Sequence, residues 1–210
     1  GFIHFVYGIL QRMRTHGAVD HPFLEKYRKE NLTQWALNWN RDNRHFLNKT
    51  LGGSMQFPKL VGVVHTGKNH EMLDMAGMRS DNKNTWYSNY SFEVFNDPWI
   101  AKNSSLFNDF MRRLFDVMTE VGLLNKEEQG GGNYAINPEH IWVSKNVKHI
   151  QCDLCQSRLC VAAEDEWAEG THCLDYKCKG TYSEEIKPEL NYYQQVYNRN
   201  ISPRVHAHEH

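Results

Sequence analysis

The spacing of apolar residues at the start of the chain predicts a helix over residues 2–14. Its apolar positions recur every three or four residues, so they share one face, as in an amphipathic helix. These positions are Ile3, Val6, Leu10 and Met13. Gly17 follows the pattern and is expected to end the helix, because glycine adopts the left-handed backbone conformation at little cost.

A second short helix is expected immediately afterwards. Asp20 suits its N-cap position and Pro22 its first turn. Phe23, Leu24 and Tyr27 would then form its apolar stripe. Two helices joined by a tight turn either pack into a core or form a DNA-reading pair, and the sequence leaves both open.

The clearest helical pattern covers residues 105–121. One side of this segment is apolar, which is typical of a helix packed on a core. The apolar side consists of Phe107, Phe110, Met111, Leu114, Met118 and Val121. Ser104 or Ser105 is expected to cap the start of the helix, and Gly122 to end it.

Short strands are expected on both sides of this long helix. Residues 60–64 form an apolar run of the length of a buried strand. Residues 134–136 and 141–143 flank Asn137-Pro138 and predict a hairpin. A helix, a Gly-Leu-Leu step and then a hairpin are typical of the second half of a winged helix. Residues 61–147 are therefore interpreted as a winged-helix-like unit.

Between the strand expected over residues 60–64 and the long helix, a stretch rich in turn residues is followed by an aromatic stretch. Residues 77–85 are rich in Gly, Asn, Ser and Asp and predict an exposed loop. The dense aromatic run over residues 86–99 could stack on bases, but it contains no Lys or Arg, so packing in the core is the better interpretation. Near the end of the chain, residues 191–200 predict a short helix and residues 205–210 a strand.

Four of the five cysteines form two pairs, Cys152-x2-Cys155 and Cys173-x4-Cys178. A Cys-x2-Cys turn places two thiolates on one side of a tight knuckle, and a second pair one hairpin later completes a tetrahedron. Four thiolates select a soft or borderline ion, for which zinc is the default. The sequence therefore predicts a structural zinc site.

The segment around these cysteines is interpreted as a zinc ribbon over residues 148–183. Two short strands are expected between residues 160 and 169, and tight turns at Gly170 and Gly180, next to the second pair. Four cysteine ligands close the coordination shell, whereas a catalytic zinc keeps one position open. The ion is therefore expected to stabilise the fold rather than to catalyse a reaction.

Alternatives to a four-cysteine zinc site stay open at this point. A redox-active Cys-x-x-Cys pair usually lies in a thioredoxin-like βαβ unit, which is not evident in this sequence. An iron–sulfur cluster would use the same four thiolates as ligands. His172 or Cys160 could replace Cys178 as a ligand. Cys160 is otherwise expected to be a small buried hydrophobic residue.

The composition is that of a globular chain. Hydrophobic residues make up 40% and aromatic residues 12% of the 210 positions, enough for a sizeable core. No stretch approaches the roughly 18 consecutive apolar residues that a membrane span needs. Five clustered cysteines favour a reducing, cytoplasmic setting over a disulfide framework. The chain starts without Met and begins and ends in mid-pattern, which suggests an excerpt from a longer protein.

The charge distribution predicts only weak binding to DNA. The formal net charge is −1. Residues 1–60 carry nine Lys/Arg against four Asp/Glu, whereas residues 151–210 carry six against ten. Phosphate contacts are therefore expected near the start of the chain rather than in the cysteine-rich part. The candidate residues are Lys26, Arg28 and Lys29, with Arg112 and Arg113 on the long helix.

Sequence motifs of known active sites are missing. The sequence has no Gly-x4-Gly-Lys-Ser/Thr phosphate loop, no Gly-x-Ser-x-Gly, no His-Glu-x-x-His and no Gly-x-Gly-x-x-Gly. This chain alone is therefore expected to have no ATPase activity, and an enzyme with an unrecognised site is the weakest alternative.

Four stretches of the sequence, taken in this order, resemble parts of a known protein family. They read GAVDHPFLEKY, VGLL…NYAINPEHIWV, IQCDLC…HCLDYKC and NYYQQVYNRN…RVHAHEH. In order and content they resemble the middle of large bacterial DEAD/DEAH-box helicases of the Druantia-like phage-defence type, which are related to zinc-containing repair helicases of the MrfA type. The similarity covers most of residues 1–20 and 121–210 and is looser over residues 30–120.

The resemblance implies a place between two RecA-like motor halves. ATP and Mg²⁺ would bind only in the motor domains of the parent protein, and DNA, these motor domains and other defence proteins would be the partners. The terminal Glu-His is a specific match, but His208 stands where the family is expected to have Arg. That departure puts any role of the basic residue in linking nucleotide state to DNA in doubt.

The overall expectation is an α+β fold in four parts. They are a basic helical segment over residues 1–60, the winged-helix-like unit over 61–147, the zinc ribbon over 148–183, and a helix and strand over 184–210 that lead back to a motor domain. The expected function is that of an accessory, DNA- or partner-contacting segment of a superfamily 2 helicase or translocase. A free-standing winged-helix and zinc-ribbon regulator or adaptor is the alternative.

Overall fold

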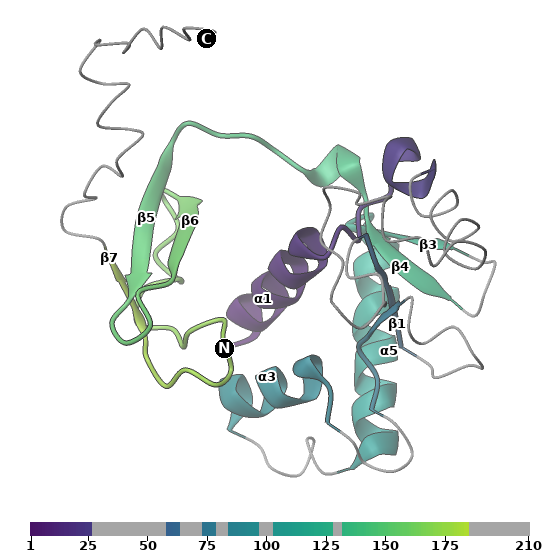
Figure 1. The fold of residues 1–210 in the computed structure, drawn as a ribbon, viewed down its shortest axis with the longest axis horizontal. Helices are drawn as coiled ribbons and strands as arrows, with labels where there is room; N and C mark the ends of the chain where they lie inside the picture. The colour runs from purple at the N-terminus through teal and green to yellow at the C-terminus, as the bar shows by residue number, and fades with distance from the viewer. Residues whose placement is uncertain (27–57, 64–72, 79–83, 97–102, 128–131, 185–210) are drawn as a thin grey trace, which may run out of the picture.

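The computed structural model describes residues 1–26, 58–63, 73–78, 84–96, 103–127 and 132–184. These residues form an α+β fold with two separate sheets (Figure 1). Three helices pack with a four-stranded sheet, and a three-stranded sheet lies on the other side of the first helix. The α+β class expected from the sequence is thereby confirmed.

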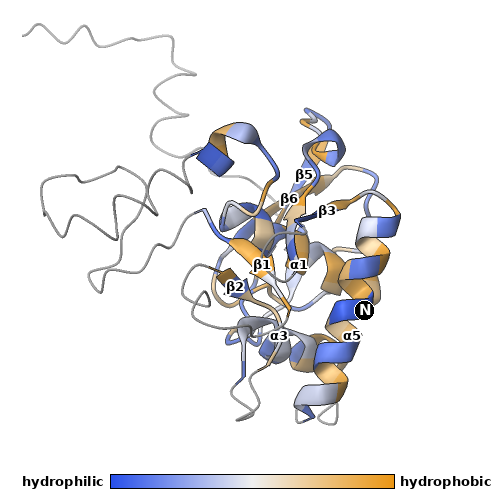
Figure 2. Cartoon of the chain, turned by 90° about the vertical axis from the view of Figure 1, so that its right-hand side faces the viewer, coloured by the Kyte–Doolittle hydropathy of each residue, from blue (hydrophilic) through white to orange (hydrophobic). Residues whose placement is uncertain are grey.

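Helix α1 spans Phe2–Thr15 and agrees with the helix expected over residues 2–14. Its buried side consists of Phe5, Ile9 and Met13, none of which is exposed to solvent. Of the other positions expected on the apolar face, Val6 and Leu10 are partly buried, but Ile3 is 61% exposed, so the expected face was wrong in part. Gly17 follows with a φ of +74°, a left-handed conformation that glycine adopts without strain. Figure 2 shows that apolar and polar residues alternate around the helices, as burial of one face requires.

Helix α3 spans Trp86–Phe95 and crosses α1 at very close range. Thr85 caps its start, because its side chain accepts a hydrogen bond from the Ser88 amide. The Tyr90 hydroxyl donates to the carbonyl oxygen of His4 at 3.1 Å, beside Gly8. A Cβ atom on Gly8 would lie within 2.5 Å of the Tyr90 ring, so only glycine fits there. Within the aromatic run, Tyr87 and Tyr90 are fully buried, as expected for core residues, and Trp86 and Phe95 are partly buried. Phe92 is 36% exposed, and Trp99 lies outside the described residues.

Helix α5 spans Ser104–Glu120 and supplies a second buried face. Its buried residues are Phe107, Met111, Leu114, Phe115 and Met118. The cap is Asn103, whose side chain accepts from the Leu106 amide, so the expectation of Ser104 or Ser105 at this position was wrong by one or two residues. Val121 lies just past the helix and is 60% exposed, whereas Gly122 ends the helix with a φ of +80°.

The four-stranded sheet has the order β2-β1-β4-β3. Its strands are β1 (Leu60–Gly62), β2 (Leu73–Met75), β3 (Leu124–Glu127) and β4 (Asn133–Ile136). Strands β1 and β2 are parallel, and β4 pairs antiparallel with both β1 and β3. The expected strand over residues 60–64 is confirmed as the fully buried β1.

The hairpin after α5 differs from the expected one. It consists of β3 and β4, whereas Pro138–His140 form a single 3-10 turn and residues 141–146 form no strand. Strand β4 already has neighbours on both edges, so no edge is left for a strand over residues 141–143. Pro138 also begins a helical turn easily, because its fixed φ suits that position and its missing N–H is not needed there. Residues 141–146 instead form an extended linker to the next sheet (Figure 1).

The second helix begins one residue later than the expected cap predicts. Residues 22–26 are helical, and the His21 ring nitrogen Nδ1 accepts from the Phe23 amide. Asp20 is not the cap, because its carboxylate accepts a hydrogen bond from the Asn125 side chain at 2.7 Å. Its amide donates to the carbonyl oxygen of Ile136. Phe23 is 63% exposed rather than buried in a stripe, and Tyr27 lies outside the described residues.

The segment expected to be an exposed loop over residues 77–85 is partly buried. Met78 is 1% exposed, and its backbone exchanges two hydrogen bonds with the Asn108 side chain, at 2.7 and 2.9 Å. Gly77 lies against the carbonyl oxygen of Val63. The expectation was wrong at the start of this segment, because the side-chain amide of Asn108 forms hydrogen bonds with the backbone N–H and C=O of Met78, which would otherwise need water.

The three-stranded sheet has the order β6-β5-β7. Its strands are β5 (Val147–Cys152), β6 (Arg158–Ala162) and β7 (Tyr182–Glu184), all antiparallel to their neighbours. Of the two strands expected between residues 160 and 169, only the end of β6 is present, and residues 163–170 form turns. Its small core contains Ile150, Val161, Ala168 and Tyr182 together with two cysteines.

Some expectations fall outside the described residues. These are the helix over residues 191–200, the strand over 205–210, and the candidate DNA contacts Arg28 and Lys29. Among the residues that the structure describes, none of the helices combines the length and the apolar character needed to cross a lipid bilayer.

Candidate metal centre

Two loops at one end of the three-stranded sheet carry the four paired cysteines. Cys152 is the last residue of β5, and its amide donates to the carbonyl oxygen of Ser157 at 2.9 Å across the turn to β6. The Gln156 amide donates back to the carbonyl oxygen of Cys152, and Gln156 adopts a φ of +62°. This tight knuckle brings Cys155 to the same side as Cys152.

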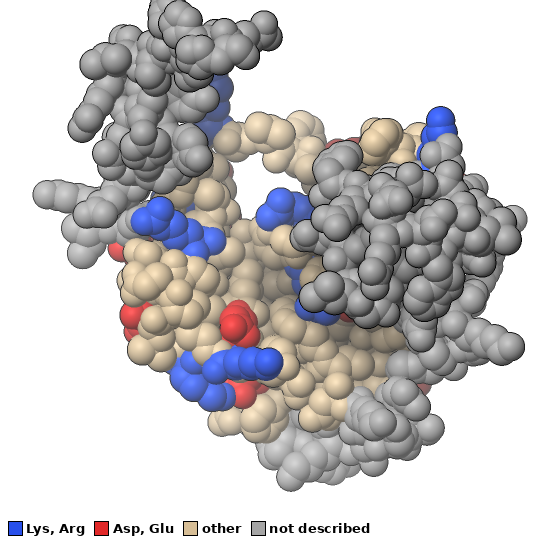
Figure 3. All heavy atoms as spheres, viewed as in Figure 1, with Lys and Arg blue, Asp and Glu red and all other residues tan. Residues whose placement is uncertain are grey.

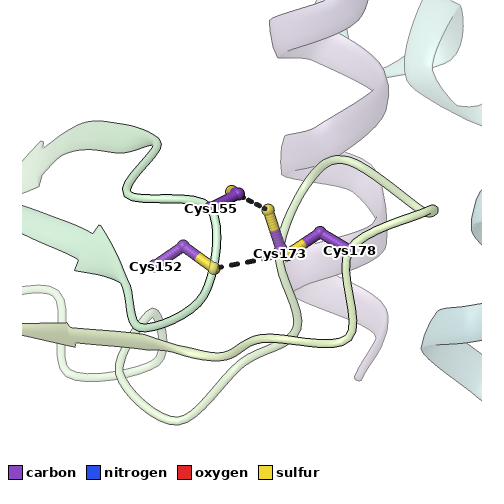
Figure 4. Close-up of side chains that lie close together, drawn as sticks. All are labelled: Cys152, Cys155, Cys173 and Cys178. Atoms are coloured by element: carbon purple, nitrogen blue, oxygen red, sulfur yellow. Dashed lines mark hydrogen bonds between the residues drawn. The ribbon is translucent and has the colours of Figure 1, made fainter.

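The second pair lies in the loop that precedes β7. The Cys173 amide donates to the carbonyl oxygen of Gly180 at 2.9 Å, and the Cys178 amide donates to the carbonyl oxygen of Asp175 at 2.8 Å. The first bond closes the loop at its base, and the second forms a tight turn within it. Both sulfur atoms consequently face the first knuckle (Figure 4).

The four sulfur atoms form one compact cluster. Cys152 Sγ lies 3.6 Å from Cys178 Sγ, and Cys155 Sγ lies 3.5 Å from Cys173 Sγ. All four lie within 4.8 Å of one another. Sulfur atoms around a tetrahedral zinc, with Zn–S bonds of about 2.3 Å, lie about 3.8 Å apart. The cluster could therefore hold one metal ion.

The same distances are incompatible with disulfide bonds between these residues. Sulfur atoms in a disulfide are about 2.05 Å apart, and all five cysteines are free in the structure. The arrangement therefore presents four separate thiols, each with one sulfur available as a ligand.

Neighbouring donors contact the sulfur atoms and would support their negative charge. The Asp175 amide donates to Cys173 Sγ and the Gly180 amide to Cys178 Sγ, each at 3.4 Å. Ser157 Oγ is hydrogen-bonded to Cys155 Sγ at 3.2 Å and lies 3.5 Å from Cys173 Sγ. Such outer contacts orient ligands and stabilise the thiolate form.

Tyr182 links this network to the core of the three-stranded sheet. It is 2% exposed, and its hydroxyl accepts a hydrogen bond from the Leu174 amide at 3.2 Å. The same hydroxyl lies 3.6 Å from Cys173 Sγ and 3.2 Å from Ser157 Oγ. The sequence reasoning missed both Ser157 and Tyr182, since neither belongs to the cysteine spacing that revealed the site.

Gly180 is required by the close passage of the two loops. A Cβ atom there would lie 2.5 Å from Cys152 Sγ and would also meet the Asp153 carboxylate. That carboxylate accepts from the Thr181 amide at 2.9 Å, so the loop cannot easily move away. The tight turn expected at Gly180 therefore has a specific steric cause, and Gly170 has the left-handed φ of +72° that a turn glycine permits.

The cysteine pKa values differ across the cluster. Burial raises the pKa of Cys152 and of Cys173. The hydrogen bonds from the side chain and backbone of Ser157 lower the pKa of Cys155 to about 6. At Cys178 the Gly180 amide opposes the shift, but burial and the nearby Cys155 and Cys173 still leave the pKa raised. Cys155 is therefore the thiol that is already ionised near neutral pH.

The cysteine loops rest against helices α1 and α3. Leu174 and Tyr176 pack on the main core, and Lys179 pairs with Glu93 of α3. From α1, Tyr7 packs edge-on against Trp167, with ring centroids 5.0 Å apart. Burial lowers the pKa of the neighbouring His4 to about 4, so its ring is neutral at neutral pH and places no charge in this contact. The metal site and the helices are thus parts of one packed arrangement.

The two alternative ligands considered from the sequence do not join the cluster. The cluster of possible metal ligands contains neither His172 nor Cys160. Cys160 is exposed, so the expectation that it is a small buried residue was wrong. Val161 fills the inward position of β6, and side chains alternate along a strand, so Cys160 must face outward.

The candidate DNA-contacting residues lie apart from the cysteine cluster. Lys26 is exposed at the end of the helical residues 22–26. Arg112 and Arg113 are exposed on α5 and form ion pairs with Asp109 and Glu120. Around the cysteine loops, basic and acidic side chains lie side by side rather than in a patch of one sign (Figure 3).

Comparison with protein-family models, with curated proteins and with solved structures finds no match to this chain.

Proposed function

We propose that Cys152, Cys155, Cys173 and Cys178 bind one zinc ion and that this ion stabilises residues 147–184 as a zinc ribbon. The observation that carries the proposal is the mutual approach of the four sulfur atoms within 4.8 Å. Four thiolates at such spacing match tetrahedral zinc in both ligand type and size. Zinc also supplies folding free energy to a module whose own core contains only a few side chains.

Iron–sulfur chemistry fits the geometry less well. In a cubane cluster each thiolate binds a different iron atom, so the four sulfur ligands stand farther apart than ligands that share a single ion. The closest sulfur pairs here are 3.5 and 3.6 Å apart, which suits one shared ion. With four thiolates the shell is closed, so the role is structural.

Elemental analysis of the purified protein tests this proposal. One zinc per chain is expected, and Cys152→Ser should abolish it, because the remaining three thiolates no longer close the shell. Cys160→Ser is the matched control and should leave the zinc content unchanged, since Cys160 lies outside the cluster. Iron with visible absorbance, or metal-free folded protein, would refute a zinc site.

At the level of the whole protein, we propose an accessory role in a superfamily 2 DNA helicase or translocase of the phage-defence type. The support is the order of the four sequence stretches that resemble such helicases. In this role α5 and the β3–β4 hairpin would serve as the winged-helix-like part, and the zinc ribbon would dock partners or shape the strand path. DNA would be a weak partner of this segment, and ATP with Mg²⁺ would bind only in the motor domains.

The test of this second proposal uses the natural full-length protein. DNA-stimulated ATP hydrolysis is expected, and Cys152→Ser should reduce its coupling to strand separation more than the hydrolysis itself. A natural protein that lacks a phosphate loop and hydrolyses no ATP would instead favour the free-standing regulator or adaptor. Either result leaves the zinc proposal to be judged by metal content alone.

A further inference from the structure

The fifth cysteine has a chemical neighbour that the zinc proposal does not use. Cys160 of β6 and His149 of β5 are direct partners in the antiparallel pairing of these strands. Their side chains point to the same outer face, and Cys160 Sγ lies 3.3 Å from His149 Nδ1. Both residues are exposed, so a reagent in solution can reach the pair.

This distance allows proton transfer between the two side chains. When His149 carries its proton on Nε2, its Nδ1 accepts a hydrogen bond from the Cys160 thiol. A thiol beside an imidazole can pass its proton to the ring and leave a thiolate, the form of cysteine that attacks electrophiles. The rigid pairing of β5 and β6 holds both groups in register.

The surroundings of the pair distinguish Cys160 from the other four cysteines. Those four converge on one another, so a metal ion would occupy their sulfur lone pairs. Cys160 is separate from them and is anchored through its backbone, because the Tyr7 hydroxyl of α1 donates to its carbonyl oxygen at 3.2 Å. Its side chain can therefore be modified without displacing a metal ligand.

We propose that Cys160 and His149 form a reactive thiol site whose substrates are low-molecular-weight disulfides. Cys160 transfers its proton to His149 Nδ1, and the thiolate attacks one sulfur of a disulfide RSSR. A new S–S bond joins Cys160 to one half, while the original S–S bond breaks. The other half leaves as a thiolate and takes the proton from the imidazolium, so the products are a mixed disulfide and RSH.

The full chain, loaded with one equivalent of zinc, is the material for the test. An aromatic disulfide such as 5,5′-dithiobis(2-nitrobenzoate), added at one equivalent, should release one equivalent of its coloured thiol in a fast phase. Peptide mapping by mass spectrometry should place the adduct on Cys160, and glutathione disulfide should modify the same residue more slowly. Cys160→Ser should remove the fast phase.

The role of the histidine is tested with a matched pair of variants. His149→Gln should slow the fast phase by about a hundredfold, the low end of what a positioned base contributes. His140→Gln, at another exposed histidine, should react like the wild-type protein. A first adduct on any of the other four cysteines, or a His149→Gln rate within twofold of wild type, would overturn the proposal.

A spectroscopic measurement keeps the test valid should His149→Gln fail to fold. The nitrogen-15 chemical shifts of the His149 ring in the wild-type protein report which nitrogen carries the proton. The pair is supported if Nδ1 carries no proton in the wild-type protein and its chemical shift changes in Cys160→Ser. A ring with its proton on Nδ1, unaffected by that substitution, would be inconsistent with proton transfer from Cys160.

Discussion

At the scale of single residues, the contacts around the sulfur atoms decide how tightly the site can hold a metal ion. Tyr182 makes such a contact without being a ligand itself, because its hydroxyl lies between Cys173 Sγ and the Leu174 amide. Removing that hydroxyl takes a hydrogen-bond donor from the thiolate and leaves the partly buried Leu174 N–H without its acceptor.

Tyr182→Phe should weaken zinc binding by about 10- to 100-fold, as is usual for partners of metal ligands. Competition with a chromophoric chelator measures this change. Tyr176→Phe is the control, since Tyr176 lies in the same loop but its hydroxyl contacts none of the four sulfur atoms. Equal affinities of wild type and Tyr182→Phe would mean that the hydroxyl does not support the thiolate.

The cysteine pKa values also predict how binding depends on pH. Between about pH 6.5 and pH 8, Cys155 is mostly ionised while Cys152, Cys173 and Cys178 keep their protons. Binding then displaces three protons, the four thiols less Cys155, so affinity falls as pH falls, by about a thousandfold per pH unit. Chelator competition at pH 6.5 and 7.5 checks this, and a tenfold change would show that only one proton is displaced.

At the scale of elements, α1 connects parts that are far apart in the sequence. Its Gly8 lies under the ring of Tyr90 from α3, while its Tyr7 contacts Trp167 and Cys160 of the cysteine-rich module. A side chain larger than hydrogen at position 8 would push α3 away. The contact between α1 and α3 thus depends on one glycine.

Gly8→Ala tests two opposing effects. Alanine favours a helix over glycine by about 1 kcal/mol, but the added methyl group would overlap the Tyr90 ring, and overpacking costs typically about 1–3 kcal/mol. Because the overlap is with the ring itself, a net loss of stability is expected in chemical denaturation at saturating zinc. Ile3→Ala, at a 61% exposed position of the same helix, should change stability by much less. A stabilised Gly8→Ala protein would mean that α3 can shift without cost.

Sequence patterns predicted the elements that depend on local spacing. The extent of α1, the apolar face of α5 and the cysteine spacing matched the structure, because each depends on local spacing. The buried face expected for α1 was wrong in part, since Ile3 is exposed and Phe5 and Ile9 fill the core instead. The strand expected over residues 141–143 is absent for a reason that depends on tertiary structure, because β4 already pairs with β1 and β3. The exposure of Cys160 could have been predicted from the sequence, because side chains alternate along a strand and the apolar Val161 next to it faces the core. Ser157 and Tyr182 could not be found, because their contacts depend on how the loops close.

At the scale of the whole molecule, the metal ion and the docking of the module onto α1 are expected to depend on each other. The module core contains few side chains, and structural zinc contributes roughly 10–16 kcal/mol of binding free energy in small domains. Without the ion, the loops that carry Leu174 and Lys179 should no longer rest on the helices.

Removal of zinc with a strong chelator should therefore raise amide hydrogen exchange throughout residues 147–184 and around Tyr7. The four-stranded sheet should keep its protection, because its core consists mainly of residues before position 137. Hydrogen exchange followed by mass spectrometry measures both regions in one experiment. Unchanged exchange in residues 147–184 would mean that the module folds without the metal.

The hydrogen bond from Tyr7 to Cys160 joins residues 153 positions apart, and this separation sets an order of events during synthesis. At about 5–20 residues per second, α1 leaves the ribosome on the order of ten seconds before the last strand of the module is made. Throughout that interval Tyr7 lacks its contacts with Trp167 and Cys160, whereas Phe5 can already pack against Tyr90 of α3 once that helix has been made. Helix α1 thus reaches its native surroundings in two stages, first on the side of the main core and last at Tyr7.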